Sequence, residues 1–474
     1  MTGLALAWSA ALNLKDAAKL QDGRAIAGWL KDVEAGKIRL GPKSLLVVDE
    51  AGMVGVRDVH KILEVAKEYG AKVILLGDTR QQKAVAAGDP LRKIVQQNGS
   101  SRLDVIRRQV RPEDRDAVNC FFDGRAKDGL RSYVDRQAVH LGTGTEVTYA
   151  AMTLDWMKSR AAHPAESHLL IAADKRTVLA LNVAAHDARK RNGELGEGVL
   201  LRTMDCTSKE ERIEFSVGDE VVFRASDKER GVFNRTSGVI VRIEQELLHI
   251  STEAGVVRMD TTAEKWQRDD GVALQHGYAT TAYSSQGLTV DRAFVLDSLS
   301  FNRASAGVAM SRHRQDCQVY VDRARRYEAK MKSIPAEEWH PIRDYKDDDC
   351  LAQVARSWSS EREKISTLDY SQWRHAGGAL AGIEVGVQEE VSLAAIERSR
   401  ANASSELKRI QDASRFQDGL LPLPFQQARS YVLPKPAPSP VTASVASNRL
   451  LDEGVDRKVL EEAREAGFES PPLL

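Results

Sequence analysis

The chain has 474 residues, 42% of them hydrophobic, with 68 lysines and arginines balanced by 68 aspartates and glutamates. This length predicts about three domains, and the zero net charge restricts any attraction for nucleic acid to a local basic patch. No apolar run approaches the roughly 18 residues of a membrane span and no secretory signal is recognisable, which excludes membrane insertion and predicts a cytoplasmic protein.

Residues 1 to about 110 are expected to alternate between strands and helices. The apolar runs 45–48 and 73–76 are short enough for buried parallel strands. Between them, apolar residues recur at helical spacing from Val56 to Ala66, and Gly70 is placed to end that helix. This pattern predicts a βαβ unit with its functional loops at the carboxyl ends of the strands.

A second mixed pattern begins near residue 135, with a strand over 168–172 and a helix from about Thr177. Residues 213–260 differ, because short β runs at 221–223, 238–243 and 247–250 are separated by turn residues. We expect a small β-barrel here, inserted into an α/β domain that resumes over 272–322.

Beyond about residue 335 the pattern loses this order. The segment 434–440 is rich in proline and predicts an extended linker, with a last amphipathic helix near 449–466. The four cysteines are widely spaced at Cys120, Cys206, Cys317 and Cys350, which argues against a disulfide framework and a clustered zinc site.

The strongest local signal is the sequence LLVVDEAGM at 45–53. A strand that ends in Asp49 and Glu50 suits nucleotide hydrolysis, in which one carboxylate holds Mg²⁺ and the other polarises the attacking water. The structural alternative is an acidic pair that only caps the next helix. The second strand ends in GDTRQ at 77–81, where Gln81 could sense a γ-phosphate or orient the water, or could be an ordinary polar turn residue.

Five motifs in order give the chain a resemblance to a known family. They are VVDEAGM, GDTRQQ, the Arg-Arg-Gln at 107–109, TTAYSSQGLTVDRAFVL at 280–296 and AMSRHRQDCQVYVD at 309–322. The sequence resembles the superfamily-1 DNA helicases of the RecD-like branch, and most of all the helicase part of conjugative relaxase-helicases of the TraI/TraA type.

The resemblance implies an α/β protein with two RecA-like motor lobes, the first incomplete, a small SH3-like β-barrel insertion and a largely disordered C-terminal tail. The expected parts are a partial first lobe over 1–130, the start of the second lobe over 131–212, the barrel over 213–265, the rest of the second lobe over 266–334 and a helical or disordered tail over 335–474.

The resemblance also implies ATP and Mg²⁺ as cofactors. Asp49 would be the magnesium-holding carboxylate and Glu50 the catalytic base, while Gln81 would link hydrolysis to the DNA groove. Arg108 and Arg312 match the family's two arginines that face the γ-phosphate, where a delocalised cation suits the developing charge.

The implied DNA contacts come from both lobes. Ser9 lies in the opening segment that resembles an early DNA-contacting motif, and Thr280, Ser285 and Gln286 lie in the motif that joins nucleotide and strand. The neighbouring Gly287 is predicted to bind the nucleotide, because a glycine lets the backbone approach a ligand closely. In the same opening segment, Trp8 could stack on a base or belong to the core.

A basic run at 323–332 could contact DNA phosphates or form a solvated helix face. It comprises Arg323, Arg325, Arg326, Lys330 and Lys332.

The phosphate-binding motif Gly-x-x-x-x-Gly-Lys-Ser/Thr, whose backbone amides and lysine hold nucleotide phosphates, does not occur in the sequence. The segment 36–44 comes nearest, but it has one residue too many and a proline where an amide should donate. In the family this loop precedes the segment matching 3–14, so we expect Met1 to fall inside the first lobe. A missing central strand would leave an apolar sheet edge exposed.

Three explanations of the absent phosphate-binding motif are open. The start of the protein is assigned too late, the gene is split so that a separate chain completes the site, or the chain is a decayed remnant of a mobile element. The expected partners are single-stranded DNA and a separately encoded relaxase or N-terminal helicase segment. The function expected is an ATP-dependent DNA helicase or translocase fragment acting in conjugative transfer. The alternatives are a non-catalytic DNA-binding or interaction remnant and an α/β ATPase unrelated to DNA.

Overall fold

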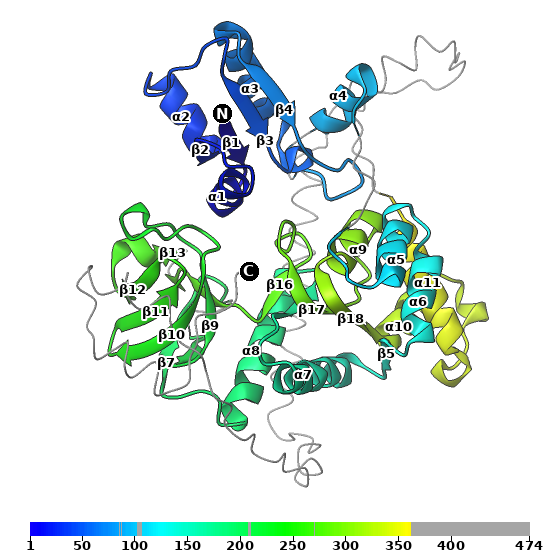
Figure 1. Ribbon diagram of the computed structural model, residues 1–474. Helices are drawn as coiled ribbons and strands as arrows, with labels where there is room; N and C mark the ends of the chain where they lie inside the picture. The colour runs from blue at the N-terminus through cyan, green and yellow to red at the C-terminus, as the bar shows by residue number, and fades with distance from the viewer. Residues whose placement is uncertain (85, 87, 102–106, 207–209, 270, 362–474) are drawn as a thin grey trace, which may run out of the picture. The chain divides into compact units, whose positions relative to one another are not determined.

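The computed structural model describes residues 1–84, 86, 88–101, 107–206, 210–269 and 271–361 (Figure 1). Its first sheet is parallel throughout, with the strand order β2-β1-β3-β4. The strands are β1 (Thr2–Ala5), β2 (Asp22–Ala25), β3 (Leu45–Val48) and β4 (Lys72–Leu75), joined by the helices α1 (Trp8–Ala17), α2 (Ile26–Glu34) and α3 (Val56–Tyr69). The predicted βαβ unit is confirmed.

The boundaries of α3 follow from its sequence. Val59, Ile62 and Ala66 lie on one face of this helix and are buried against the sheet. Gly70 ends the helix in the left-handed conformation, with φ of 65°, which a glycine adopts without steric cost.

The outer strand of this sheet is unusually exposed for a parallel strand. β4 pairs only with β3 among the described strands, and Ile74 and Leu76 are 44% and 40% exposed. Strands of parallel sheets are normally covered on both faces. Among the described residues, the β4 edge of this sheet therefore presents apolar side chains to solvent.

The second sheet is also parallel, with the order β16-β6-β17-β18-β5. Its strands are β5 (Val139–Gly142), β6 (His168–Ala172), β16 (Ala279–Thr281), β17 (Val290–Leu296) and β18 (His313–Asp322). The remaining helices are α4 (Pro90–Asn98), α5 (Pro112–Phe122), α6 (Ala126–Asp135), α7 (Thr145–Ala162), α8 (Lys175–Arg191), α9 (Arg303–Met310), α10 (Arg323–Lys332) and α11 (Asp347–Ser359). Two parallel α/β sheets are the arrangement expected of RecA-like lobes.

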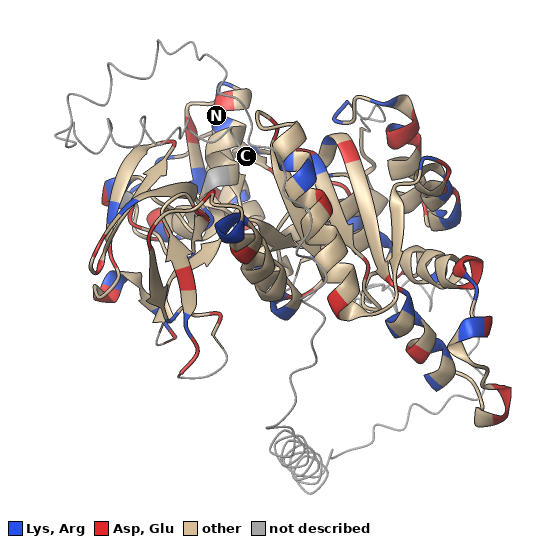
Figure 2. Cartoon of the chain, turned by 90° about the horizontal axis from the view of Figure 1, so that it is seen from below, with Lys and Arg blue, Asp and Glu red and all other residues tan. Residues whose placement is uncertain are grey.

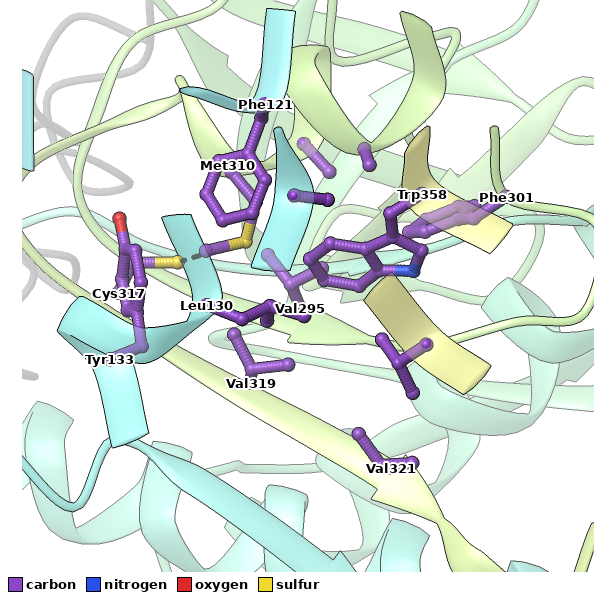
Figure 3. Packing of buried hydrophobic residues seen from close by; sticks show 14 of the residues in the cluster. Phe121, Leu130, Tyr133, Val295, Phe301, Met310, Cys317, Val319, Val321 and Trp358 are labelled. Carbon is purple, nitrogen blue, oxygen red and sulfur yellow. Dashed lines mark hydrogen bonds between the residues drawn. The ribbon is translucent and has the colours of Figure 1, made fainter. Parts of the chain in front are cut away.

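The core of the second sheet includes helices from segments that were predicted to belong to the first lobe and to the C-terminal tail. Phe121 of α5 and Tyr133 of α6 pack with Val319 of β18 and with Trp358 of α11, and all four are fully buried (Figure 3). The chain therefore contributes to this second core from α5 onward, ahead of the first-lobe boundary predicted at residue 130. The region after 335 is likewise part of this core as far as α11.

Between α8 and β16 the chain forms a separate antiparallel unit, with the sheet order β12-β11-β10-β9-β15. Its strands are β7 (Gly198–Leu201), β8 (Ile213–Ser216), β9 (Glu220–Phe223), β10 (Ser237–Glu244), β11 (Leu247–Thr252), β12 (Gly255–Asp260), β13 (Gln267–Arg268), β14 (Gly271–Val272) and β15 (Leu274–His276). The predicted β insertion is present. Its core also includes Leu201 and Leu274, so it extends beyond the predicted 213–265 at both ends.

Short 3-10 turns complete the described structure: Ala51–Met53, Lys228–Arg230, Glu264–Trp266, Ala336–Glu338 and Ile342–Asp344. The proline-rich segment 434–440 and the predicted helix near 449–466 lie outside the described residues. Within the described part, no helix has the length and apolar character needed to cross a membrane.

Candidate nucleotide-binding site

The two acidic residues after β3 lie in a tight, strained turn. Glu50 has a φ of 48° and a ψ of 41°, the left-handed conformation that residues other than glycine seldom adopt. Its backbone N–H donates to Oδ1 of Asp49 over 2.9 Å. Strain of this kind is commonly held at functional positions, and here it fixes the directions of two adjacent carboxylates.

Glu50 meets residues from distant parts of the sequence. Nε2 of Gln286 donates a hydrogen bond to Oε2 of Glu50 over 3.0 Å. Burial raises the pKa of Glu50, and the charge of Asp49 raises it further, whereas the Gln286 hydrogen bond and the cations Arg312 and Arg108 lower it. Burial also raises the pKa of Asp49. Two half-buried carboxylates side by side attract a cation.

Arg312 is a buried cation whose charge interacts with that of Glu50. Only 2% exposed, it donates from Nε to the carbonyl of Val308 over 2.8 Å and from Nη1 to the carbonyls of Ser285 and Leu288, each over 3.3 Å. Burial lowers its pKa to about 9, with a further contribution from Arg108, while Glu50 raises it. Arg312 therefore remains protonated at neutral pH and cross-links the turn 285–288 to α9.

The segment 107–111 lies along the start of β18. Nη1 of Arg108 donates to the carbonyl of Ser311 over 2.9 Å, and Nε2 of the fully buried Gln109 donates to the carbonyls of Ser311 and His313, both over 3.0 Å. The backbone N–H of Val110 donates to the carbonyl of Arg314. Burial lowers the pKa of Arg108, and Glu50 raises it. Both predicted arginines thus lie within electrostatic reach of Glu50.

Gln81 lies in the loop after β4 and lines a pocket of about 370 Å³. The pocket is formed by the loop 79–83 and by residues 300–305 at the start of α9, together with Ala282 and Tyr283. Oε1 of Gln81 is buried and has no hydrogen-bond partner, which leaves an acceptor available to a ligand. Gln81 therefore shares a pocket with Ala282 and Tyr283, which directly precede the turn that carries Ser285 and Gln286.

The predicted DNA-contacting residues have different environments. Thr280 is half-buried in β16. Gly287 is exposed, and its φ of +85° is a backbone conformation that favours glycine, although there is room for a side chain at this position. Ser285 is fully buried and its hydroxyl donates to the carbonyl of Ala282, so in this arrangement it stabilises the turn and does not face solvent. Ser9 lies in the first turn of α1.

Trp8, next to Ser9, stacks on Phe233 of the β insertion, with ring centroids 4.9 Å apart and an interplanar angle of 19°. Trp8 is half-buried, so the alternative prediction that it belongs to the hydrophobic core is wrong. Side by side, the two rings form an aromatic surface beside α1.

The basic run 323–332 does not form a continuous cationic face. Arg326 is buried and forms a two-point ion pair with Asp297, at 2.6 and 2.7 Å, and Arg323 pairs with Asp347 over 3.0 Å. Lysines and arginines elsewhere alternate with acidic residues along the helices and strands (Figure 2).

The role of Gln109 was not predicted. Gln109 was noted only as part of a motif, yet it is the buried link between the segment 107–111 and β18. Asp78, at the end of the second predicted strand, accepts from Nε of Arg80 over 3.2 Å, and Arg80 also reaches Asp123 over 3.3 Å. The contacts of Gln109 and of Arg80 with Asp123 join residues far apart in the sequence, so they leave no local signal.

Comparisons with known proteins agree with the motifs. A family model described as an AAA domain matches residues 1–144. The conjugal transfer protein TraA of Rhizobium radiobacter is 34% identical over 323 residues, which is 68% of this chain and 28% of TraA. The multifunctional conjugation protein TraI of Escherichia coli is 23% identical, over 72% of this chain and 26% of TraI. The ATP-dependent RecD2 DNA helicase of Deinococcus radiodurans is 28% identical, over 52% of this chain and 31% of RecD2.

Solved structures of the helicase Pif1 are also similar. Bacteroides Pif1 bound to single-stranded DNA is 17% identical with a TM-score of 0.42, covering 67% of this chain and 82% of that one. Its complex with ADP-AlF3 and single-stranded DNA is 16% identical with a TM-score of 0.44, covering 80% and 88%.

The chain spans less than a third of the length of these curated relatives. Over that span, the motifs, the parallel α/β sheets and the matches to TraA, TraI and RecD2 agree. Over that span the chain is related to the TraA and TraI conjugation proteins and to the RecD-like superfamily-1 helicases.

Proposed function

We propose that this chain is the motor part of an ATP-dependent DNA helicase or translocase that moves on single-stranded DNA during conjugative transfer. The observation that carries the proposal is the convergence on Glu50 of Gln286, Arg108 and Arg312, which come from three separate segments. The relatives support it, since TraA and TraI are conjugation proteins and RecD2 is an ATP-dependent DNA helicase.

The carboxylates fit a nucleotide-bound magnesium ion. Asp49 and Glu50 offer the hard oxygen ligands that Mg²⁺ prefers, and each has a pKa raised by burial, so that a divalent cation would stabilise their charged forms. We assign Asp49 to hold the ion, directly or through its waters. ATP would supply the transferable phosphoryl group.

Glu50 would then accept the proton of the attacking water. The raised pKa brings its basicity closer to neutral pH, where a general base works best, while the Gln286 hydrogen bond keeps the carboxylate oriented. The protonated Arg312 and Arg108 would stabilise the negative charge that develops on the phosphoryl oxygens. The charges of both arginines already act on Glu50 and lower its pKa.

DNA would be held by segments adjoining these residues. We assign contacts to Ser9 on α1, to Thr280 and to Gln286, with Gln81 coupling the loop after β4 to the strand. The buried Ser285 would act only by stabilising the turn. Because Gln286 contacts Glu50 from the same turn, a shift of this turn would be felt at the base. We further propose that the β insertion is an SH3-like barrel that borders the strand beside Trp8.

The alternative function is a non-catalytic DNA-binding module. It is favoured by the lack, in the printed sequence, of a Gly-x-x-x-x-Gly-Lys-Ser/Thr motif to hold the phosphates. The two functions share the DNA-binding surface and differ in turnover.

Strand displacement separates the two. A fluorescently labelled forked duplex is mixed with the full chain, with and without ATP and Mg²⁺, alone and together with any polypeptide encoded immediately upstream. A motor displaces the labelled strand only when ATP is present, and Glu50→Gln abolishes displacement while leaving DNA binding intact. Binding without displacement in every mixture would support the binding module and contradict the motor.

A further inference from the structure

A cluster of three buried ligand-type side chains lies where the β insertion meets the second sheet, away from the Glu50 site. His186 is on α8, Asp219 is in the turn between β8 and β9, and His276 ends β15. Segments that are up to 90 positions apart in sequence thus bring two imidazoles and one carboxylate together. Among the described residues, this is the one group of three histidine, cysteine or acidic side chains with the spacing of metal ligands.

The distances suit a shared cation. The ligand atoms of the three residues all lie within 4.8 Å of one another. Nδ1 of His186 is 3.0 Å from Oδ1 of Asp219, and Nε2 of His276 is 3.4 Å from Oδ2. In a tetrahedral zinc site with bonds of about 2.0 Å, neighbouring ligand atoms are about 3.3 Å apart, so small adjustments would accommodate the ion.

Burial makes the group unusual. Asp219 is fully buried, and His186 and His276 are each 3% exposed. Nε2 of His276 is buried and has no hydrogen-bond partner, although it faces the carboxylate. A buried polar nitrogen without a partner costs free energy, and coordination would remove that cost.

The surroundings resemble the second layer of a zinc site. The far nitrogen of His186, Nε2, lies 3.7 Å from Oε2 of Glu214, the carboxylate–histidine arrangement that orients metal-bound imidazoles. Asp219 accepts from the Ser216 N–H over 2.6 Å and from the hydroxyl of Tyr278, so the carboxylate is fixed in place.

The nearest cation is already neutralised. Nη1 of Arg189 donates to the hydroxyl of Tyr278 over 2.9 Å. Its charge is balanced by Glu194, at 2.9 Å from Nε, and by Glu220, at 4.0 Å from Nη1. Its positive charge therefore does not exclude a metal ion from the cluster.

We propose that His186, Asp219 and His276 form a structural Zn²⁺ site that fastens the β insertion to α8. A water molecule or the Tyr278 hydroxyl completes the coordination. The ion would join α8, the turn before β9 and β15, which already share polar contacts such as that of Arg189 with the carbonyl of Gly218, and its binding free energy would add to the stability of this junction. The site does not depend on the proposed helicase function.

The direct test is the metal content of the full chain, expressed without a histidine tag. After incubation with ZnCl₂ and gel filtration, mass spectrometry should find one zinc per chain. Co²⁺ in place of zinc should give the visible absorption of a tetrahedral site. His276→Gln and Asp219→Asn should each lower the zinc affinity at least tenfold, and a chelator should lower the Tm of the wild type but not of these variants.

The matched control is His249→Gln. His249 is equally buried in the same β unit, on β11, but pairs with Glu244 and lies outside the cluster. It should leave the zinc content at one per chain. A folded wild-type chain that keeps no zinc would overturn the proposal, and the cluster would then be a hydrogen-bonded network held by protons.

Discussion

Gln286 and Glu50 are 236 positions apart in the sequence, yet the amide Nε2 of the first donates to the carboxylate Oε2 of the second over 3.0 Å. This bond connects the acidic turn after β3 with the turn before β17. A side chain that would sense DNA thus touches the side chain that would activate water. A single substitution can remove this contact, which is the proposed physical link between DNA binding and ATP hydrolysis.

Replacing Gln286 with alanine should change the pH dependence of ATP hydrolysis. The Gln286 hydrogen bond lowers the pKa of Glu50, so its loss raises that pKa and protonates the base at higher pH. The acidic limb of the kcat profile should move to higher pH, so that kcat on that limb is lower than that of the wild type. Gln96→Ala, at an exposed position on α4, is the control. An unchanged profile would show that the bond plays no part in catalysis.

Glu50→Gln should stabilise the folded protein at neutral pH. The folded pKa of Glu50 is raised above its ordinary value of 4.5, so the charged form is disfavoured by folding. This destabilisation is absent below pH 4.5 and grows as the pH rises through the folded pKa. The neutral amide removes it, and the Tm should rise by a few degrees at pH 7 but not at pH 4. Thermal unfolding measured at both pH values checks this, and an equal or lower Tm at pH 7 contradicts it.

Local signals sufficed for the regular elements of the first sheet. The apolar run 45–48 and the glycine at 70 mark the ends of β3 and α3 without reference to the rest of the chain. The packing of α5 and α6 in the core of the second sheet was not predicted, because their ordinary amphipathic patterns do not reveal which sheet they cover. The same holds for α11, whose buried face was not distinguishable from that of a surface helix.

Trp358→Ala should show that α11 belongs to the second core. Trp358 is fully buried against Phe121 and Phe301, and its Nε1 donates to Oδ1 of Asp297 over 2.8 Å. Truncation should cost about 3–5 kcal/mol in the free energy of unfolding, measured with urea. Trp339→Ala, at a tryptophan that is 58% exposed, should cost less than about 0.5 kcal/mol. Similar values for the two variants would contradict the core assignment.

Trp8→Ala should weaken binding of single-stranded DNA. The half-buried ring beside Phe233 offers a stacking surface, and stacking on an aromatic side chain is worth about 1–3 kcal/mol per base. The Kd for an oligothymidine, measured by fluorescence anisotropy, should rise at least fivefold, and Phe233→Ala should act in the same direction. Trp339→Ala again serves as the control. Unchanged affinity together with a lower Tm would assign Trp8 a structural role only.

The residues of the candidate site could be predicted from the sequence, but the contacts between them could not. Recognisable motifs contain the five predicted residues Asp49, Glu50, Gln81, Arg108 and Arg312. However, the contact between Gln286 and Glu50 and the burial of Ser285 could not be predicted from the sequence. These facts depend on how the turn 282–287 packs. The cluster of His186, Asp219 and His276 left no motif at all, because its members are brought together only by the folding of the β insertion against α8.

The most direct test of the central claim is ATP hydrolysis stimulated by single-stranded DNA. The full chain, with and without any polypeptide encoded immediately upstream, is compared with Glu50→Gln and with Glu68→Gln, which changes an exposed glutamate on α3. The account predicts hydrolysis that single-stranded DNA increases, that Glu50→Gln abolishes and that Glu68→Gln leaves intact. No hydrolysis in any mixture of folded protein, or hydrolysis that survives Glu50→Gln, would contradict it.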